Sequence, residues 1–347
     1  MNATLPTSET LRAALAGLLE GEPPARTAAA VDRLIATYRG TTPTHTPVLR
    51  DAADAAAYAA YRMPATFEAE RAALGALADA APGWAPGSHV DVGGGTGAAV
   101  WAAAATWPGS RTTTVLDWAG PALAAGRDLA AGVPALRDTR WTRARVGGAA
   151  GELPACDLLT VGYVLKELTP DDRAALVAGA ARAARAVVVV EPGSPDGYER
   201  IMAARDLLIG AGLRIAAPCP HDGACPIERG ADWCHFAARV GRSSLHRQVK
   251  GGSLPYEDEK FSYVAAVRLP AQAAPARVVR RPMTRKGQVL LDLCTVADGL
   301  RRETVTKRRG AEYRAARSAD WGDAWPPPQR EHRQGGAERE RDPGSDA

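Results

Sequence analysis

The sequence contains few cysteines, and it has neither a long hydrophobic run nor a basic leader segment. Five cysteines among 347 residues make an odd number, and clustered thiols in a reducing compartment favour metal binding over disulfides. No run of about eighteen apolar residues is present, so no membrane-spanning helix is expected. The N-terminal segment carries Glu9, Glu20 and Glu22 in place of the basic and apolar regions of a secretory signal. We therefore expect a soluble, cytoplasmic protein that does not associate with membranes.

Aromatic residues are also scarce, at 5 % of the chain, although hydrophobic residues reach 46 % and many of them are alanine. This composition predicts many helices and small core side chains. A length of 347 residues suffices for two domains, or for one large α/β domain with additions.

Positive charge is concentrated towards one end of the chain. The net charge is +4, but residues 268–317 contain thirteen Lys or Arg against four acids, a local balance of +9, which leaves −5 for the remainder. A basic region confined to one end is typical of a surface that contacts a phosphate backbone. The alternative is a solvated, arginine-rich surface without a partner.

The first two segments of the chain differ in their hydrophobic pattern. Residues 1–84 predict helices that form a cap, with an interruption at Pro64 and a new helix over Phe67–Ala80. In residues 85–216, apolar strands alternate with helices, which indicates an α/β fold with a parallel sheet covered on both faces. The strands are expected at His89–Val92, Thr112–Leu116, Trp141–Val146, Asp157–Val161 and Ala186–Val190.

The later segments are less regular. Residues 217–246 read as a cysteine-rich insertion that ends in a short helix near Phe236–His246. Residues 247–325 predict further strands and the basic C-terminal region, in which Arg277–Met283 pairs with Gln288–Thr295 around a turn. Residues 326–347 contain too few apolar side chains to fold, so a disordered tail is expected.

A glycine-rich turn that begins at Asp91 lies between the first predicted strand and a helix. Gly93, Gly95 and Gly97 let the backbone approach a ligand that a Cβ atom would exclude. Such a turn also suits a dinucleotide, or no ligand at all. Asp117 ends the second strand, where its carboxylate can accept both ribose hydroxyls of an adenosine, and Asp91 precedes the glycines. Together these features favour a site for S-adenosylmethionine.

The residues that follow the fourth predicted strand should face the same ligand, because ligands bind outside the carboxyl ends of parallel strands. Gly162 and Tyr163 are therefore candidate pocket residues. The Asn/Asp-Pro-Pro-aromatic motif that base-amino methyltransferases usually carry at this place is absent. Glu191, at the end of the fifth strand, either acts as a base or caps the next element. No catalytic residue is assigned from the sequence.

Three cysteines lie within sixteen residues, in a loop rich in Pro, Gly and Asp that offers them little apolar surroundings. They are Cys219, Cys225 and Cys234. The best candidate for a fourth ligand is Cys294, at the end of an apolar strand, whereas Cys156 reads as a small buried residue. Ligation by four cysteines suits either zinc or an iron–sulfur cluster.

A zinc site of three cysteines and one histidine stays open as well, because His221 and His235 flank the cysteines. The paired C-x2-C spacing of common zinc ribbons is absent. Proline follows both Cys219 and Cys225, as it follows cluster ligands in some ferredoxins.

Eight short segments, spread from about residue 45 to residue 326, together resemble the methyltransferase-like family associated with the small ribosomal subunit of bacteria and mitochondria. The most specific are the Pro-Cys-Pro-His and Asp-Trp-Cys-His-Phe elements. The segments are Tyr61–Thr66, Asp91–Gly97, Tyr163–Leu168, Glu191–Gly193, Ala217–Asp222, Asp232–Phe236, Lys260–Tyr263 and Trp321–Pro326.

The resemblance implies a class I methyltransferase fold, Rossmann-like, that binds S-adenosylmethionine. It also implies that Cys219, Cys225, Cys234 and Cys294 hold a [4Fe–4S] cluster, and that the protein acts on the small ribosomal subunit and contacts its rRNA. Two functions stay open, an RNA methyltransferase and a non-catalytic, RNA-binding assembly factor. A monomer is expected.

Overall fold

The N-terminal region consists of three helices, as expected. The computed structural model describes residues 6–21, 23–39, 49–145, 152–242 and 254–327. Helix α1 (Ser8–Leu18) begins after Thr7, α2 spans Pro24–Arg39, and α3 (Ala52–Ala80) begins after Asp51, whose carboxylate accepts the Asp54 N–H. No helix in these ranges is long and apolar enough to cross a membrane.

The main sheet has the strand order β3-β2-β1-β4-β5-β8-β6. Strands β1 to β5 are parallel, and β8 lies antiparallel between β5 and β6. This order, with one antiparallel strand inserted next to the last, is that of class I methyltransferases, so the predicted α/β core is confirmed. The strands are β1 (Ser88–Val92), β2 (Thr112–Asp117), β3 (Arg140–Arg143), β4 (Cys156–Gly162), β5 (Ala184–Pro192), β6 (Arg214–Ala217) and β8 (Tyr256–Val267).

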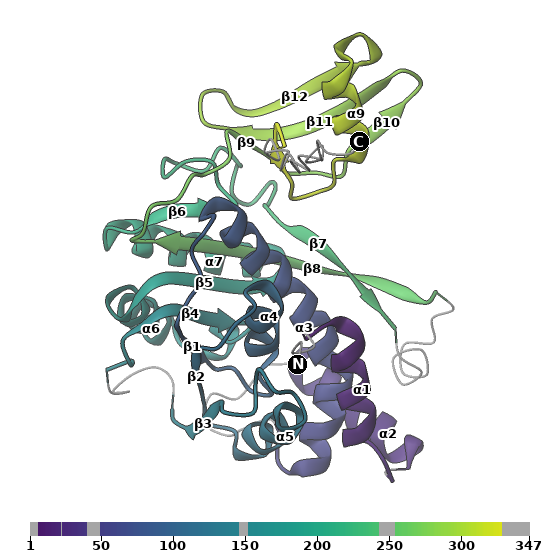
Figure 1. The fold of residues 1–347 in the computed structure, drawn as a ribbon, viewed down its shortest axis with the longest axis vertical. Coiled ribbons are helices and arrows are strands. Elements are labelled where there is room, and N and C mark those ends of the chain that lie inside the picture. The colour runs from purple at the N-terminus through teal and green to yellow at the C-terminus, as the bar shows by residue number, and fades with distance from the viewer. Residues whose placement is uncertain (1–5, 22, 40–48, 146–151, 243–253, 328–347) are drawn as a thin grey trace, which may run out of the picture.

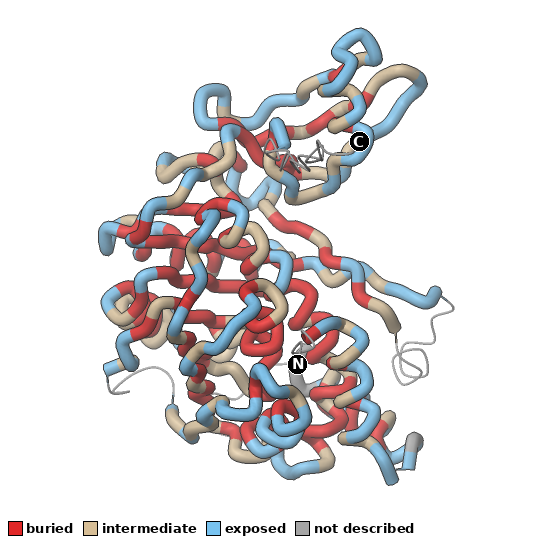
Figure 2. The backbone as a smooth tube through the Cα atoms, viewed as in Figure 1, coloured by how far each residue is buried: buried red, intermediate tan, exposed pale blue. Residues whose placement is uncertain are grey.

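Helices cover both faces of this sheet, because its central strands are apolar on both sides (Figures 1 and 2). In β5, Val188 and Val190 face a core shared with α3 and α4, whereas Val187 and Val189 face a core shared with α6 and α7. The helices after α3 are α4 (Ala98–Thr106), α5 (Gly120–Ala131), α6 (Pro170–Ala183) and α7 (Pro195–Gly210).

Helix α3 corrects the prediction of a break at Pro64. The helix runs through this proline without ending, and Met63, Pro64 and Phe67 are all buried. A proline inside a helix removes one hydrogen bond and costs about 3 kcal/mol. Burial of the helix against α4, β7 and β8 outweighs that cost.

Strand β7 corrects a second prediction, since Phe236–Gly241 is a strand and not the start of a helix. It pairs antiparallel with the first half of β8, while the second half of β8 pairs with β5. The two strands form a ribbon that extends beyond the main sheet (Figure 1). Residues 243–246, which the expected helix included, lie outside the described residues.

The C-terminal region forms a separate sheet with its own core (Figure 1). The predicted pairing of Arg277–Met283 with Gln288–Thr295 is confirmed at both ends, because Arg277 lies opposite Cys294 and Met283 lies opposite Leu290, although the first segment forms two short strands instead of one. The hairpin strand β12 was not predicted. The elements are β9 (Ala276–Val278), β10 (Met283–Arg285), β11 (Gln288–Thr295), β12 (Gly299–Thr306), α9 (Ala311–Ser318) and β13 (Ala324–Trp325). Most of the predicted disordered tail, residues 328–347, lies outside the described residues.

Candidate functional site

The glycine turn between β1 and α4 depends on its glycines. Gly93, Gly95 and Gly97 have φ angles of 69°, 52° and 84°, a region that other residues rarely adopt. A Cβ atom at Gly93 would lie 2.7 Å from a methyl carbon of Val164, and one at Gly97 would lie 2.6 Å from the Trp141 ring. The turn therefore has the close-packed backbone that a cofactor cradle requires.

Asp117 ends β2 next to this turn. One carboxylate oxygen accepts the Gly95 N–H at 2.9 Å and the other accepts the Ala119 N–H at 2.8 Å. Burial raises the pKa of Asp117, and these backbone donors oppose the rise. The carboxylate is thus fixed in orientation at the place where the sequence predicted a ribose acceptor.

An open cavity lies at the carboxyl ends of β1, β2 and β4. The cavity contains four of the six predicted cofactor residues, and Gly97 and Asp91 lie beside and beneath it. The residues that matter below are Gly93, Gly95, Asp117, Gly162, Tyr163 and Glu167.

Tyr163 lines the cavity in a strained conformation. Its φ is 61°, and it is the only non-glycine residue with a positive φ in the described ranges. Its hydroxyl donates to Glu259 at 3.1 Å, and Glu259 pairs with Arg62 at 3.0 Å. Burial, followed by the nearby Glu259 carboxylate, raises the pKa of Tyr163 well above its usual value. Contacts from α3 and β8 therefore hold this side chain in place.

Glu167, which was not predicted as a site residue, also lines the cavity. Burial, and then the charges of Asp117 and Glu191, raise the pKa of Glu167 to about 7. Glu191 itself is fully buried, accepts the Leu165 N–H at 3.1 Å and pairs with Arg200. The predicted cap of the next element is wrong, because Ser194 caps α7, and Glu191 instead holds the short 3-10 helix that carries Glu167.

Asp91 lies beneath the turn and not in the cavity. It is 1 % exposed, and one oxygen accepts the Thr160 hydroxyl at 2.7 Å. Glu70 of α3, which the sequence analysis also missed, is fully buried and is close enough to interact with Asp91 through its charge. A signal was present, because Glu70 follows Phe67 by three residues and precedes Leu74 by four, on the apolar face of the helix.

A second cavity, between the main sheet and the C-terminal sheet, brings the four predicted cysteines together. Cys219, Cys225, Cys234 and Cys294 all line it, with His221 beside them. Within the described ranges, no three or more His, Cys, Asp or Glu side chains are arranged as a metal site. The shared cavity supplies a suitable donor set, and the metal itself stays a prediction.

The alternation of β11 explains why Cys294 reaches this cavity. Val289, Leu291 and Leu293 face the C-terminal core, so Cys294 faces the opposite side, where its sulfur lies 4.0 Å from Nε2 of His221. Cys156 instead begins β4 and packs in the core with α6, far from this loop in the fold.

Two buried arginines anchor the cysteine loop. Arg205 of α7 is 3 % exposed and donates to the carbonyl oxygens of His221 and Gly223, at 2.9 and 2.7 Å. Arg277 of β9 is 6 % exposed and donates to the carbonyl oxygen of Pro218 at 3.0 Å. The loop is therefore tied to the methyltransferase core through α7 and to the C-terminal sheet through β9.

The cysteine thiols themselves lie in apolar surroundings. Burial, and then the neighbouring cysteines, raise the pKa of Cys294 to about 12 and that of Cys234 well above its usual value. The Ser262 hydroxyl donates to the Cys234 carbonyl at 2.7 Å. His235 does not line the cavity and stacks on Trp233. His221 is thus the better placed of the two predicted histidines.

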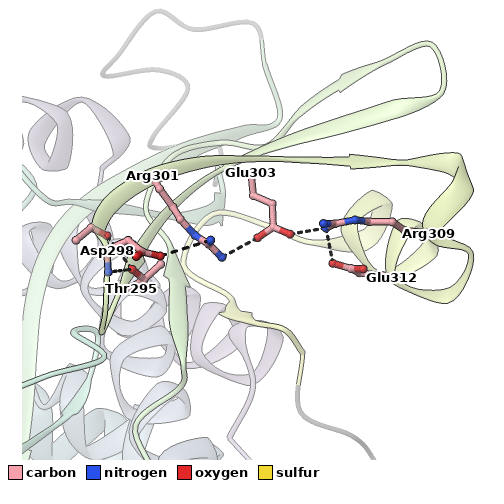
Figure 3. A network of polar contacts seen from close by, with 7 residues as sticks. Thr295, Asp298, Arg301, Glu303, Arg309 and Glu312 are labelled. Carbon is pink, nitrogen blue, oxygen red and sulfur yellow. Dashed lines mark hydrogen bonds and ion pairs between the residues drawn. The ribbon is translucent and has the colours of Figure 1, made fainter.

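The basic C-terminal sheet contains many arginines that are already paired with acids (Figure 3). Arg301 pairs with Asp298 and Glu303, and Arg309 pairs with Glu303 and Glu312. Arg302 pairs with Asp292, and Arg280 and Arg281 pair with Asp232 and Asp258. The charge balance of the sequence therefore overstates the positive charge that this sheet offers to a partner.

Four other basic residues form an exposed group that we call the basic tip, comprising Arg285, Lys286, Lys307 and Arg308. None of them pairs with an acid in the described part of the chain. They gather at one end of the sheet because Gln288 pairs with Thr306, and because the Lys307 N–H donates to the Gly287 carbonyl at 2.9 Å.

The chain is similar in sequence to one known family and to several of its members. Residues 52–326 match the family model described as "Mitochondrial small ribosomal subunit Rsm22". The chain is 28% identical over 182 residues to Rsm22-cox11 tandem protein 2, mitochondrial, of Schizosaccharomyces pombe, a match of 40% of this chain and 24% of that protein. It is 26% identical over 301 residues to the human ribosome assembly protein METTL17, mitochondrial, a match of 78% of this chain and 62% of that protein.

The chain thus spans about a quarter of the yeast relative and less than two thirds of the human one. Among solved structures, magnesium protoporphyrin IX methyltransferase from Synechocystis PCC 6803, with bound SAM, is similar at a TM-score of 0.38 and 14% identity. That match covers 60% of this chain and 81% of the other.

Proposed function

The chain belongs to the Rsm22 family of the mitochondrial small ribosomal subunit, and from this premise we propose that it binds S-adenosylmethionine and methylates RNA of the small ribosomal subunit. The observation that carries the proposal is the cradle of Gly93, Gly95 and Asp117 at the carboxyl edge of a class I methyltransferase sheet. A cytoplasmic location and a monomeric state stay predictions.

The cavity residues have separate roles in this proposal. Asp117 would accept the ribose hydroxyls, because its orientation is fixed by two backbone donors, and the glycine turn would admit the rest of the cofactor. The bound cofactor supplies an electrophilic methyl group. Glu167, with a pKa of about 7, is placed to accept a proton from a nucleophile. The protein otherwise contributes alignment of the target.

A second function, a non-catalytic assembly factor, is favoured by the surroundings of Tyr163. This residue stands where base-amino methyltransferases usually have their catalytic motif, and its hydroxyl is tied to Glu259 and Arg62. In this function, cofactor and metal hold an RNA-binding shape without methyl transfer.

Incubation of the protein with labelled cofactor and small-subunit RNA from a deletion strain separates the two functions. We expect label in the RNA, and less label with Glu167→Gln at unchanged cofactor affinity. Binding of cofactor and RNA without incorporation of label would reject the enzyme and favour the assembly factor.

We further propose that the four cysteines hold a [4Fe–4S] cluster, with zinc as the alternative. The support is their gathering around one cavity and the absence of an acid among its lining residues. Protein purified without oxygen should be brown, and Cys294→Ser should lose the colour. Colourless protein with one zinc per chain would overturn the cluster.

The basic tip is the surface that we propose for contact with rRNA. Its four cations are exposed and unpaired with described acids, so they can neutralise phosphates without first breaking an internal ion pair. The paired arginines of the same sheet would have to give up their acids to do so.

A further inference from the structure

Two buried acids lie beneath the glycine turn without a described counter-ion. Glu70 is fully buried and Asp91 is 1 % exposed. Within the described ranges, both oxygens of Glu70 and one oxygen of Asp91 have no hydrogen-bond partner. Buried polar atoms are nearly always hydrogen-bonded, and burial of an unpaired charge is costly. Three such atoms in one place indicate a site that a ligand completes.

Both acids lie directly against glycines of the cofactor cavity. A Cβ atom at Gly162 would overlap Oε1 of Glu70, and one at Gly94 would overlap the Asp91 carboxylate. Gly162 lines the cavity, and Gly94 lies between the lining residues Gly93 and Gly95. Each carboxyl group therefore packs directly against the backbone of a glycine in or beside the cavity wall.

In the described part of the chain, the groups that interact with the two acids add no positive charge. Asp117 and Asp91 repel each other, Tyr163 lies close to Glu70, and Thr160 donates to Asp91. His89 bonds to Thr160 at 2.8 Å and is neutral, because burial lowers its pKa to about 3.

Burial and mutual repulsion oppose the simultaneous ionisation of the two acids in the free protein. Burial, and then the Asp117 charge, raise the pKa of Asp91 to about 7, and burial and Asp91 raise that of Glu70 well above its usual value. The free protein thus retains at least one proton that a cation could replace.

We propose that Glu70, together with Asp91, recognises the positively charged methionine part of S-adenosylmethionine, and that cofactor binding expels a proton from this pair. The inference rests on the proposed function, since it requires that the cavity bind this cofactor. The cofactor carries a sulfonium and an ammonium against one carboxylate, a net charge of +1. That charge replaces the carboxyl proton, which passes to the solvent.

Binding calorimetry measures directly whether a proton is released when the cofactor binds. Titrations of S-adenosylmethionine at pH 7.5, in two buffers of different ionisation enthalpy, give the number of protons released. We expect roughly 0.5–1 proton from the wild-type protein by linkage. Glu70→Gln should release none and should bind about tenfold more weakly, because the attraction between the carboxylate and the positive charge of the cofactor is lost. Methylthioadenosine, a neutral nucleoside without the methionine part, should release none from the wild type.

Two control variants identify which carboxyl group releases the proton. Glu167→Gln removes the other cavity acid with a pKa near neutrality, and proton release should persist in it. Glu68→Gln alters an acid of the same helix that pairs with Arg71, and it should leave both release and affinity unchanged. Proton release that persists in Glu70→Gln but disappears in Glu167→Gln would overturn the proposal.

The free protein offers a second test that does not depend on the cofactor. A carboxyl whose pKa is raised by folding contributes stability below the unfolded value of about 4.3, and loses it as pH rises through the folded value. Glu70→Gln should therefore melt above the wild type at pH 8 and equal it near pH 4.5. An equal melting temperature at pH 8 would overturn the acidic pair, and Asp91→Asn repeats the test should Glu70→Gln not fold.

The failure of this inference differs from the failure of the proposed function. A wild-type protein that binds no S-adenosylmethionine at all would reject the proposed function. Cofactor binding without proton release would reject only the role of the acidic pair.

Discussion

The cofactor cavity and the cysteine cavity are built by different means. The first is shaped by backbone, with three left-handed glycines and an aspartate fixed by two N–H groups. The second is shaped by side chains from a loop and a distant strand, which two buried arginines tie together. The first therefore exists without its ligand, whereas the second should depend on its anchors and on whatever binds the thiols.

Loss of the Arg205 anchor should have the largest effect and should break only the cysteine cavity. Arg205→Ala removes a buried guanidinium and its two hydrogen bonds to the carbonyl oxygens of His221 and Gly223, at a cost of roughly 2–4 kcal/mol. We expect a lower free energy of unfolding in urea and loss of bound metal, with cofactor affinity unchanged. Arg205→Lys, which keeps one donor nitrogen, should lose less stability and less metal. A loss of cofactor affinity as large as the loss of bound metal would contradict the separation of the two cavities.

A side chain at Gly94 should break the cofactor cavity alone. In Gly94→Ala the added carbon would lie 2.6 Å from the carboxyl carbon of Asp91 and 2.9 Å from Val115. Overpacking of this kind costs about 2 kcal/mol, so calorimetry should show cofactor affinity reduced roughly 30-fold, with metal content unchanged. Gly75→Ala, where the added carbon meets nothing within 4 Å, is the matched control. Wild-type affinity in Gly94→Ala would show that the turn relaxes.

The basic tip is linked to the cysteine cavity and not to the cofactor cavity, because it belongs to the sheet that supplies Cys294. Alanine at all four tip positions should weaken RNA binding about tenfold or more and lower the salt slope by roughly 3–4, one for each lost phosphate contact. The control is triple alanine at Arg301, Arg302 and Arg309, which are paired with acids. Figure 3 shows the pairs of Arg301 and Arg309. A larger loss of RNA binding in that control would mean that the RNA contacts the paired arginines and not the basic tip.

The smallest effect is expected at Tyr163. Tyr163→Phe removes the hydroxyl that donates to Glu259 but keeps the ring and the strained backbone. A lost hydrogen bond to a partly buried carboxylate costs about 1 kcal/mol, which corresponds to roughly fivefold in cofactor affinity. Tyr163→Phe with unchanged affinity would mean that the backbone alone holds this wall of the cavity.

The cofactor cavity was largely predictable from the sequence because its signals are local. A strand, a glycine turn and Asp117 at the end of the next strand follow each other within thirty residues, and the strand order then brings them together. Glu167 and Glu70 were missed for different reasons. Glu167 reaches the cavity because Glu191 holds its helical turn, and Glu70 lies on the apolar face of the helix predicted over Phe67–Ala80, where a buried acid is not expected.

Non-local contacts explain the two wrong assignments. Phe236–Gly241 contains alanines and arginine that suit a helix, and it forms a strand because β8 pairs with it along its length. Pro64 stays within α3 because tertiary burial outweighs a local penalty. The sequence also could not show which basic residues are unpaired and form the basic tip. Ion pairs such as Arg302–Asp292 depend on the register between strands, which the sequence does not reveal.

The late position of β8 in the chain has a consequence for folding during synthesis. Strand β8 lies between β5 and β6 and pairs with both of them. These two strands can therefore join one sheet only after residues 256–267 have left the ribosome. Until then both strands present an unpaired edge, which is where misfolding and aggregation begin. The same strand carries Glu259 to Tyr163 and Ser262 to Cys234. Its arrival therefore closes the sheet and secures Tyr163 in the first cavity, whereas the second cavity also needs Arg277 and Cys294, which follow later in the chain.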